Sequence, residues 1–66
     1  MKRDVMTQVA IDLIGLGYPT KAVRLDKRTM VVDLLDGRVI ESSWFKKDEY
    51  ADSLAKLVEK CSTSRS

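Results

Sequence analysis

The spacing of hydrophobic residues changes twice along this chain and limits the folds open to it. Hydrophobic residues follow a helical period over 4–16, an alternating period over 21–44 and a helical period again over 47–61. Side chains return to one face of a helix every 3.6 residues and to one face of a strand every two. The pattern therefore predicts an α+β domain, with a helix on either side of a strand region.

The first predicted helix covers residues 4–16. Its apolar arc contains Val5, Met6, Val9, Ala10, Leu13, Ile14 and Leu16. Ile11 falls among polar residues, so we expect it to be at least partly exposed. Gly15, Gly17 and Pro19 predict the end of this helix, because glycine accepts the left-handed conformation and proline cannot continue a helix.

The second predicted helix, 47–61, has the clearest pattern in the chain. Its apolar arc contains Tyr50, Ala51, Leu54, Ala55, Leu57, Val58 and Cys61. Asp48 and Glu49 lie in its first turn, where negative charge suits the helix dipole. Residues 62–66 are polar and predict a disordered tail, so the folded domain is expected to span 1–61.

Between the helices, the alternating pattern predicts three antiparallel strands near 21–26, 29–35 and 38–44. Asp36-Gly37 is a strong signal for a two-residue hairpin turn, because both residues tolerate the positive φ that a type I′ turn needs. Lys27-Arg28 is a weaker turn. The expected fold is helix-strand-strand-strand-helix, a three-stranded antiparallel sheet with both helices on one face.

The two turns also predict which residues share a face of the sheet. A two-residue turn at Asp36-Gly37 pairs Leu34 with Val39 and Asp33 with Ile40. The expected core face contains Val23, Leu25, Met30, Val32, Leu34 and Val39. The opposite face contains Ala22, Arg24, Val31, Asp33, Leu35, Arg38, Ile40, Ser42 and Trp44. That second face is too apolar for a plain solvent-exposed surface.

The apolar second face is the basis of our first functional hypothesis, a protein-binding module that regulates, links or inhibits another protein. Its candidate partner-binding residues are Val31, Leu35, Ile40, Trp44, Arg24 and Arg38. A homodimer is one form that this binding can take, since a domain of about 60 residues buries only roughly 60% of its unfolded surface. The alternative is that Trp44 folds back over the core and the other apolar residues are scattered surface residues.

Several kinds of chemistry are excluded by composition. The chain has no histidine and one cysteine, Cys61. An internal disulfide cannot form, a zinc site lacks ligands, and neither a Ser-His-Asp nor a Cys-His arrangement is available. We therefore expect a protein that is not an enzyme and that needs neither a metal nor another cofactor. Cys61 lies on the apolar arc of its helix, where a buried thiol is the usual role.

The sequence also favours a cytoplasmic location. No uninterrupted apolar segment reaches the length of a signal peptide or a membrane-spanning helix, so we expect no membrane partner. A length of 66 residues is typical of short bacterial or phage regulators.

Basic residues support a second hypothesis, a nucleic-acid-binding regulator. The net charge is only +2, but Lys27 and Arg28 lie at the first predicted hairpin tip and Lys46 and Lys47 at the start of the second helix. The order of elements resembles that of double-stranded RNA-binding domains and of HicA-type toxins. The resemblance implies RNA contacts at those two places. The usual motif residues of the RNA-binding domains and the catalytic histidine of the toxins are absent.

Overall fold

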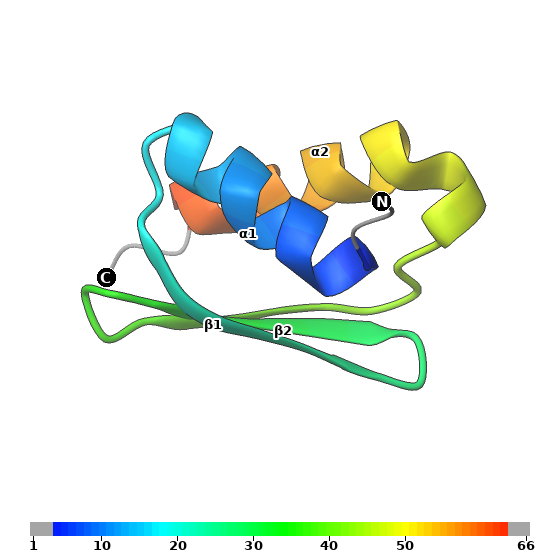
Figure 1. Ribbon diagram of the computed structural model, residues 1–66, viewed down its shortest axis with the longest axis horizontal. Coiled ribbons are helices and arrows are strands. Elements are labelled where there is room, and N and C mark those ends of the chain that lie inside the picture. Colours follow the sequence, from blue (N-terminus) through cyan, green and yellow to red (C-terminus); the bar gives the residue numbers. More distant parts are fainter. Residues whose placement is uncertain (1–3, 64–66) are drawn as a thin grey trace.

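The computed structural model describes residues 4–63. Its elements are α1 (Val5–Gly15), β1 (Thr20–Asp26), β2 (Thr29–Leu34), β3 (Val39–Ser42), a 3₁₀ turn η1 (Lys47–Glu49) and α2 (Tyr50–Thr63). The strands form one antiparallel sheet in the order β1-β2-β3. Both helices lie on the same side of this sheet (Figure 1). The predicted α+β fold is confirmed.

Helix α1 begins and ends through local hydrogen bonds. The carboxylate of Asp4 accepts a 2.9 Å hydrogen bond from the backbone N–H of Thr7, which satisfies one of the unpaired donors at the helix start. Beyond its last turn, Gly17 has a φ of 97°, and the N–H of Tyr18 donates a 2.9 Å hydrogen bond to the carbonyl of Leu13. The predicted glycine stop is therefore at Gly17.

Only a narrow strip of α1 faces the sheet. Val9 and Leu13 are fully buried, and Ile11 is exposed as expected. Ile14 and Leu16 were expected on the buried arc, but both are exposed. Ile14 projects to the side of the helix away from Val9 and Leu13, and Leu16 lies in the C-terminal cap, beyond the last residue of the helix.

The first hairpin has the predicted register. Val23 pairs with Val32, and Leu25 pairs with Met30. The two-residue turn at Lys27-Arg28 places Lys27 at a φ of 58°, a left-handed conformation that favours glycine.

The second hairpin differs from the prediction by one residue. Val32 pairs with Ile40 and Asp33 with Val39. The N–H of Leu34 donates a 2.9 Å hydrogen bond to the carbonyl of Arg38, which closes a three-residue loop. Gly37 has a φ of 99° and is the one loop residue with a positive φ. This loop needs a single left-handed residue, whereas a type I′ turn would have needed two.

The shifted register turns β3 over relative to the prediction, because a slip of one position moves every side chain of a strand to the other face. Ser42, predicted on the open face, is 3% exposed. Ile40, predicted on the open face, is 4% exposed and belongs to the core. Val39, predicted in the core, is 57% exposed.

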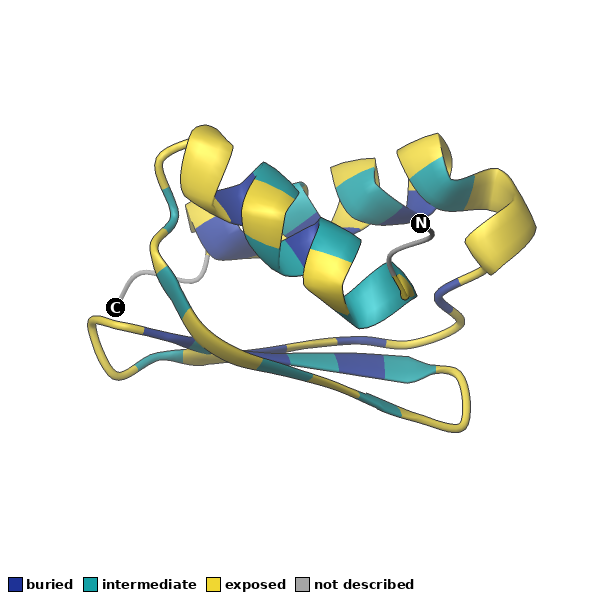
Figure 2. Ribbon diagram, viewed as in Figure 1, coloured by how far each residue is buried: buried dark blue, intermediate teal, exposed yellow. Residues whose placement is uncertain are grey.

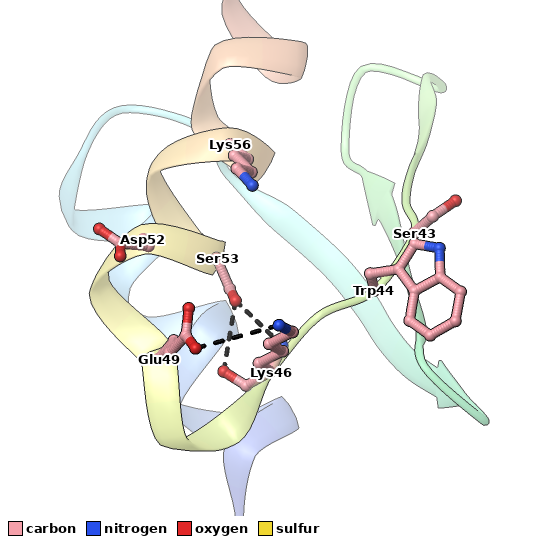
Figure 3. A pocket seen from close by; sticks show the side chains of 7 residues that line it. All are labelled: Ser43, Trp44, Lys46, Glu49, Asp52, Ser53 and Lys56. Atoms are coloured by element: carbon pink, nitrogen blue, oxygen red, sulfur yellow. Dashed lines mark hydrogen bonds and ion pairs between the residues drawn. The ribbon is translucent and has the colours of Figure 1, made fainter.

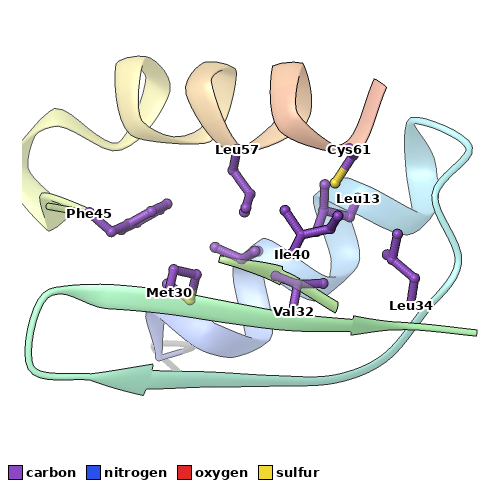
Figure 4. Close-up of a cluster of buried hydrophobic side chains, with 9 residues drawn as sticks. Leu13, Met30, Val32, Leu34, Ile40, Phe45, Leu57 and Cys61 are labelled. Atoms are coloured by element: carbon purple, nitrogen blue, oxygen red, sulfur yellow. The ribbon is translucent and has the colours of Figure 1, made fainter. Parts of the chain in front are cut away.

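The core lies between the sheet and the two helices (Figures 2 and 4). Its buried residues are Val9, Leu13, Met30, Val32, Leu34, Ile40, Phe45, Leu57 and Cys61. Phe45, which the sequence pattern did not indicate, is 5% exposed and occupies the place that the alternative gave to Trp44. Cys61 is buried as predicted, and burial raises the pKa of its thiol.

Helix α2 extends two residues beyond its predicted end. Ser62 and Thr63, expected in a disordered tail, are helical, and the Thr63 hydroxyl donates a 2.9 Å hydrogen bond to the carbonyl of Glu59. Residues 64–66 of the expected tail, and residues 1–3, lie outside the described part of the chain.

Candidate functional site

The connection between β3 and α2 holds the most unusual residue of the described chain. Trp44 has a φ of 62°, and its side chain is 64% exposed. A bulky residue in the left-handed region is uncommon, because its Cβ crowds the neighbouring carbonyl. Strain of this kind persists only where surrounding contacts impose it, and it collects at functional sites.

The contacts that support this conformation involve the two residues that follow Trp44. The N–H of Phe45 donates a 2.7 Å hydrogen bond to the carbonyl of Arg28, which ties the connection to the tip of the first hairpin. The Phe45 ring packs edge-on against Tyr50, with a centroid distance of 5.9 Å. The N–H of Lys46 donates a 3.0 Å hydrogen bond to Oγ of the buried Ser53 on α2. With Phe45 anchored in the core, Trp44 is turned outward.

The outward indole meets an arginine from the first hairpin. The guanidinium carbon of Arg28 lies 5.2 Å from the centroid of the Trp44 ring, a cation–π contact. Both side chains are on the surface. Arg28 and Trp44 come from the two segments that the Phe45–Arg28 hydrogen bond joins, so the backbone fixes their approach.

Two lysines complete the cluster. Lys46 and Lys47 are exposed and line a surface hollow together with Arg28 and Trp44. Asp48 is the one acidic residue of this hollow. We call Arg28, Trp44, Lys46 and Lys47 the basic-aromatic site.

A second hollow borders the other side of the Trp44 connection (Figure 3). It is lined by Ser43, Trp44, Lys46, Glu49, Asp52, Ser53 and Lys56. Lys46 Nζ lies 3.9 Å from a carboxylate oxygen of Glu49, a weak pair because both side chains are about half exposed. Figure 3 shows the indole of Trp44 directed away from α2 and these carboxylates. Lys46 therefore borders both hollows and pairs with Glu49 on the α2 side, whereas Arg28 lies against the Trp44 ring.

The candidate nucleic-acid-binding residues lie at one end of the sheet. Lys27 and Arg28 form the tip of the first hairpin, and Lys46 and Lys47 follow the adjacent connection. The contact between Trp44 and Arg28 was not predicted from the sequence. The correct register could have revealed it, since extending the observed pairing of Met30 with Ser42 by two positions sets Arg28 opposite Trp44.

The candidate partner-binding residues are not brought together. Ile40 is in the core, so its assignment to an open-face interface is wrong. Leu35 is exposed in the loop after β2, whereas Trp44 lies near the start of β2, at the opposite end of the sheet. Val31 is half-buried between its strand partners Arg24 and Glu41.

Arg38, the other predicted partner-binding cation, is engaged within the chain. Its Nε donates a 2.8 Å hydrogen bond to Asp36, and its Nη1 donates a 3.0 Å hydrogen bond to the carbonyl of Cys61. These contacts hold the second hairpin against the C-terminal part of α2. Arg38 therefore stabilises the fold.

Residues 4–63 were found to contain neither a metal site nor a membrane-spanning helix. No group of three or more His, Cys, Asp or Glu residues there could hold a metal ion. Within the same residues, no helix combines the length and apolarity needed to cross a membrane.

No protein-family model matches this chain, and the curated proteins and the solved structures gave no significant match.

Proposed function

We propose that this protein acts by binding nucleic acid through the basic-aromatic site, with Lys27 next to Arg28 in the hairpin turn. The observation that carries the proposal is the Arg28 guanidinium held 5.2 Å from the centre of the exposed Trp44 ring, beside Lys46 and Lys47. Cations that neutralise phosphates supply most of the affinity in nonspecific nucleic-acid binding. An exposed aromatic ring among them supplies a surface on which bases can stack.

The proposal also includes the absence of catalysis and a cytoplasmic location, both of which are based on the amino-acid composition. Binding without catalysis suits a chain that lacks histidine. A cytoplasmic setting suits its single buried thiol, because reducing compartments keep such thiols unpaired.

Asp48 and Glu49 limit the strength of this binding. Both follow the two lysines directly, and their charges oppose an approaching phosphate. We therefore expect moderate affinity that depends strongly on salt, carried by about three phosphate contacts.

The test is fluorescence anisotropy with a labelled oligonucleotide at low ionic strength. Combined replacement of Arg28, Lys46 and Lys47 by alanine should weaken binding at least about tenfold, because three phosphate partners are lost. Lys21→Ala is the matched control, since it removes the same charge from an exposed position at the other end of β1. Equal affinity of the triple variant and the unchanged protein would contradict the proposal.

Protein binding or homodimer formation is a second candidate, favoured by exposed apolar residues at the far end of the sheet. Leu35 lies in the loop between β2 and β3, and Val39 is exposed on the open face. The surface next to Leu35 is hollowed, and Tyr18 and Pro19 line that hollow.

The double replacement of Leu35 and Val39 by lysine tests this second candidate. Both positions are exposed, so the variant should stay folded. Sedimentation analysis of the unchanged protein should then show a dimer that the variant lacks. A monomeric unchanged protein would contradict the homodimer.

A further inference from the structure

The two faces of the Trp44 ring are not equivalent. Arg28 lies over one face at 5.2 Å, yet the residue remains 64% exposed. Since the indole is directed away from α2, a second planar group has access to the ring (Figure 3). Nucleobases stack on such rings, and an arginine on the other face strengthens the platform through its charge.

We infer that the ligand of the basic-aromatic site is an unpaired nucleic-acid strand, one of whose bases stacks on the accessible face of Trp44. The inference rests on the proposed function and goes further, because it specifies the class of nucleic acid. In a duplex, each base is already stacked between its neighbours, so a fixed surface ring reaches backbone and groove edges only. In a single strand, bases can turn out onto aromatic side chains.

The charges around the site favour the same ligand. Arg28 approaches Trp44 from the hairpin, and Lys46 and Lys47, which follow Trp44 in the chain, line the same hollow. Phosphates on either side of one stacked base can therefore each meet a cation.

Acidic residues border this path. Asp48 lies within the basic hollow, and Glu49 and Asp52 line the hollow next to it. A duplex would bring the phosphates of its second strand toward these carboxylates, and that repulsion disfavours it. A single strand carries one row of phosphates and so meets less of this repulsion.

Trp44 is the only tryptophan in the chain, so its fluorescence reports on this site alone. Unlabelled single-stranded DNA and RNA of about 12 nucleotides, and duplexes of the same sequence, would be titrated into the full chain. We expect saturable quenching by the single strands and much weaker binding of the duplexes.

Substitutions of Trp44 separate stacking from charge. Trp44→Gly removes the ring and suits the left-handed backbone, so the variant should stay folded by circular dichroism. Its affinity for single strands, measured by anisotropy, should fall about tenfold, as expected for the loss of one stacked base. Trp44→Phe keeps a ring and should lose less.

The possible results distinguish this inference from the proposed function. Equal or tighter binding of the duplex would overturn the inference and leave the proposed function standing. So would single-strand binding that neither quenches Trp44 nor weakens in Trp44→Gly. If no nucleic acid binds, both fail.

Discussion

The Tyr50 hydroxyl donates a 2.6 Å hydrogen bond to Oδ2 of Asp12, and this bond joins α2 to α1. The other carboxylate oxygen of Asp12 accepts a 3.0 Å hydrogen bond from the Gln8 amide. The Tyr50 ring also packs against Phe45, the residue that anchors the connection carrying Trp44. Tyr50 therefore both joins the two helices and packs against the connection that carries the candidate site.

Tyr50→Phe should lower the free energy of unfolding by about 1–2 kcal/mol, because it removes a hydrogen bond to a carboxylate and keeps the ring. Urea denaturation measures the change. Tyr18→Phe is the matched control, since no hydrogen bond of the Tyr18 hydroxyl occurs within residues 4–63. Equal stability of Tyr50→Phe and Tyr18→Phe would show that the Tyr50–Asp12 hydrogen bond does not contribute to the free energy of unfolding.

The same hydroxyl predicts a loss of stability in alkali. Burial, with a further contribution from the Asp12 hydrogen bond, raises the pKa of Tyr50 well above its ordinary value of 10. Above about pH 10 the unfolded phenol loses its proton while the folded one keeps it, so the unfolded state binds fewer protons and stability falls as the pH rises. Denaturation across that pH range should therefore show the advantage of the unchanged protein over Tyr50→Phe shrinking. An advantage that grows with pH would contradict this prediction.

The register of the second hairpin predicts opposite results at adjacent positions. Ile40→Ala should destabilise the protein by about 2–4 kcal/mol, since it empties part of the core. Val39→Ala should change stability by less than about 0.5 kcal/mol, because its side chain is exposed. Thermal or urea denaturation of both variants tests the assignment, and the reverse order would restore the register expected from a two-residue turn.

The left-handed Lys27 predicts a gain of stability. Lys27→Gly relieves a conformation that costs a non-glycine residue about 1–2 kcal/mol, although glycine loses part of this gain to its greater freedom when unfolded. A net increase of up to about 1 kcal/mol is expected by urea denaturation. The exposed Lys21→Gly in β1 is the control and should be destabilising, because glycine weakens a strand. A destabilised Lys27→Gly would show that the turn is not strained.

The fold was largely predictable from the sequence because it follows from long repeated patterns. The two helices, the three strands and the register of the first hairpin rest on several residues each. The second hairpin rested on the Asp36-Gly37 signal alone, which does not distinguish a two-residue turn from a three-residue loop ending at Gly37. That difference of one residue places Ile40 in the core and Val39 on the open face, and so removes Ile40 from the predicted apolar patch.

The candidate site was only partly predictable. The basic residues were visible as pairs in the sequence, but their relation to Trp44 depends on the register and on the positive φ of Trp44. The choice of Phe45 over Trp44 for the core is likewise set by backbone direction, which hydrophobicity does not report. The Arg28–Trp44 contact and the burial of Phe45 depend on tertiary structure, which a local sequence pattern does not predict.

The salt dependence of single-strand binding tests the central claim most directly. The logarithm of the association constant should fall linearly with the logarithm of salt concentration, with a slope near −2 for about three phosphate contacts. Each alanine at Arg28, Lys46 or Lys47 should reduce the steepness by about 0.7, while Lys21→Ala leaves it unchanged. Binding that is absent at low salt, or indifferent to salt and to these substitutions, would contradict the assignment of a nucleic-acid site.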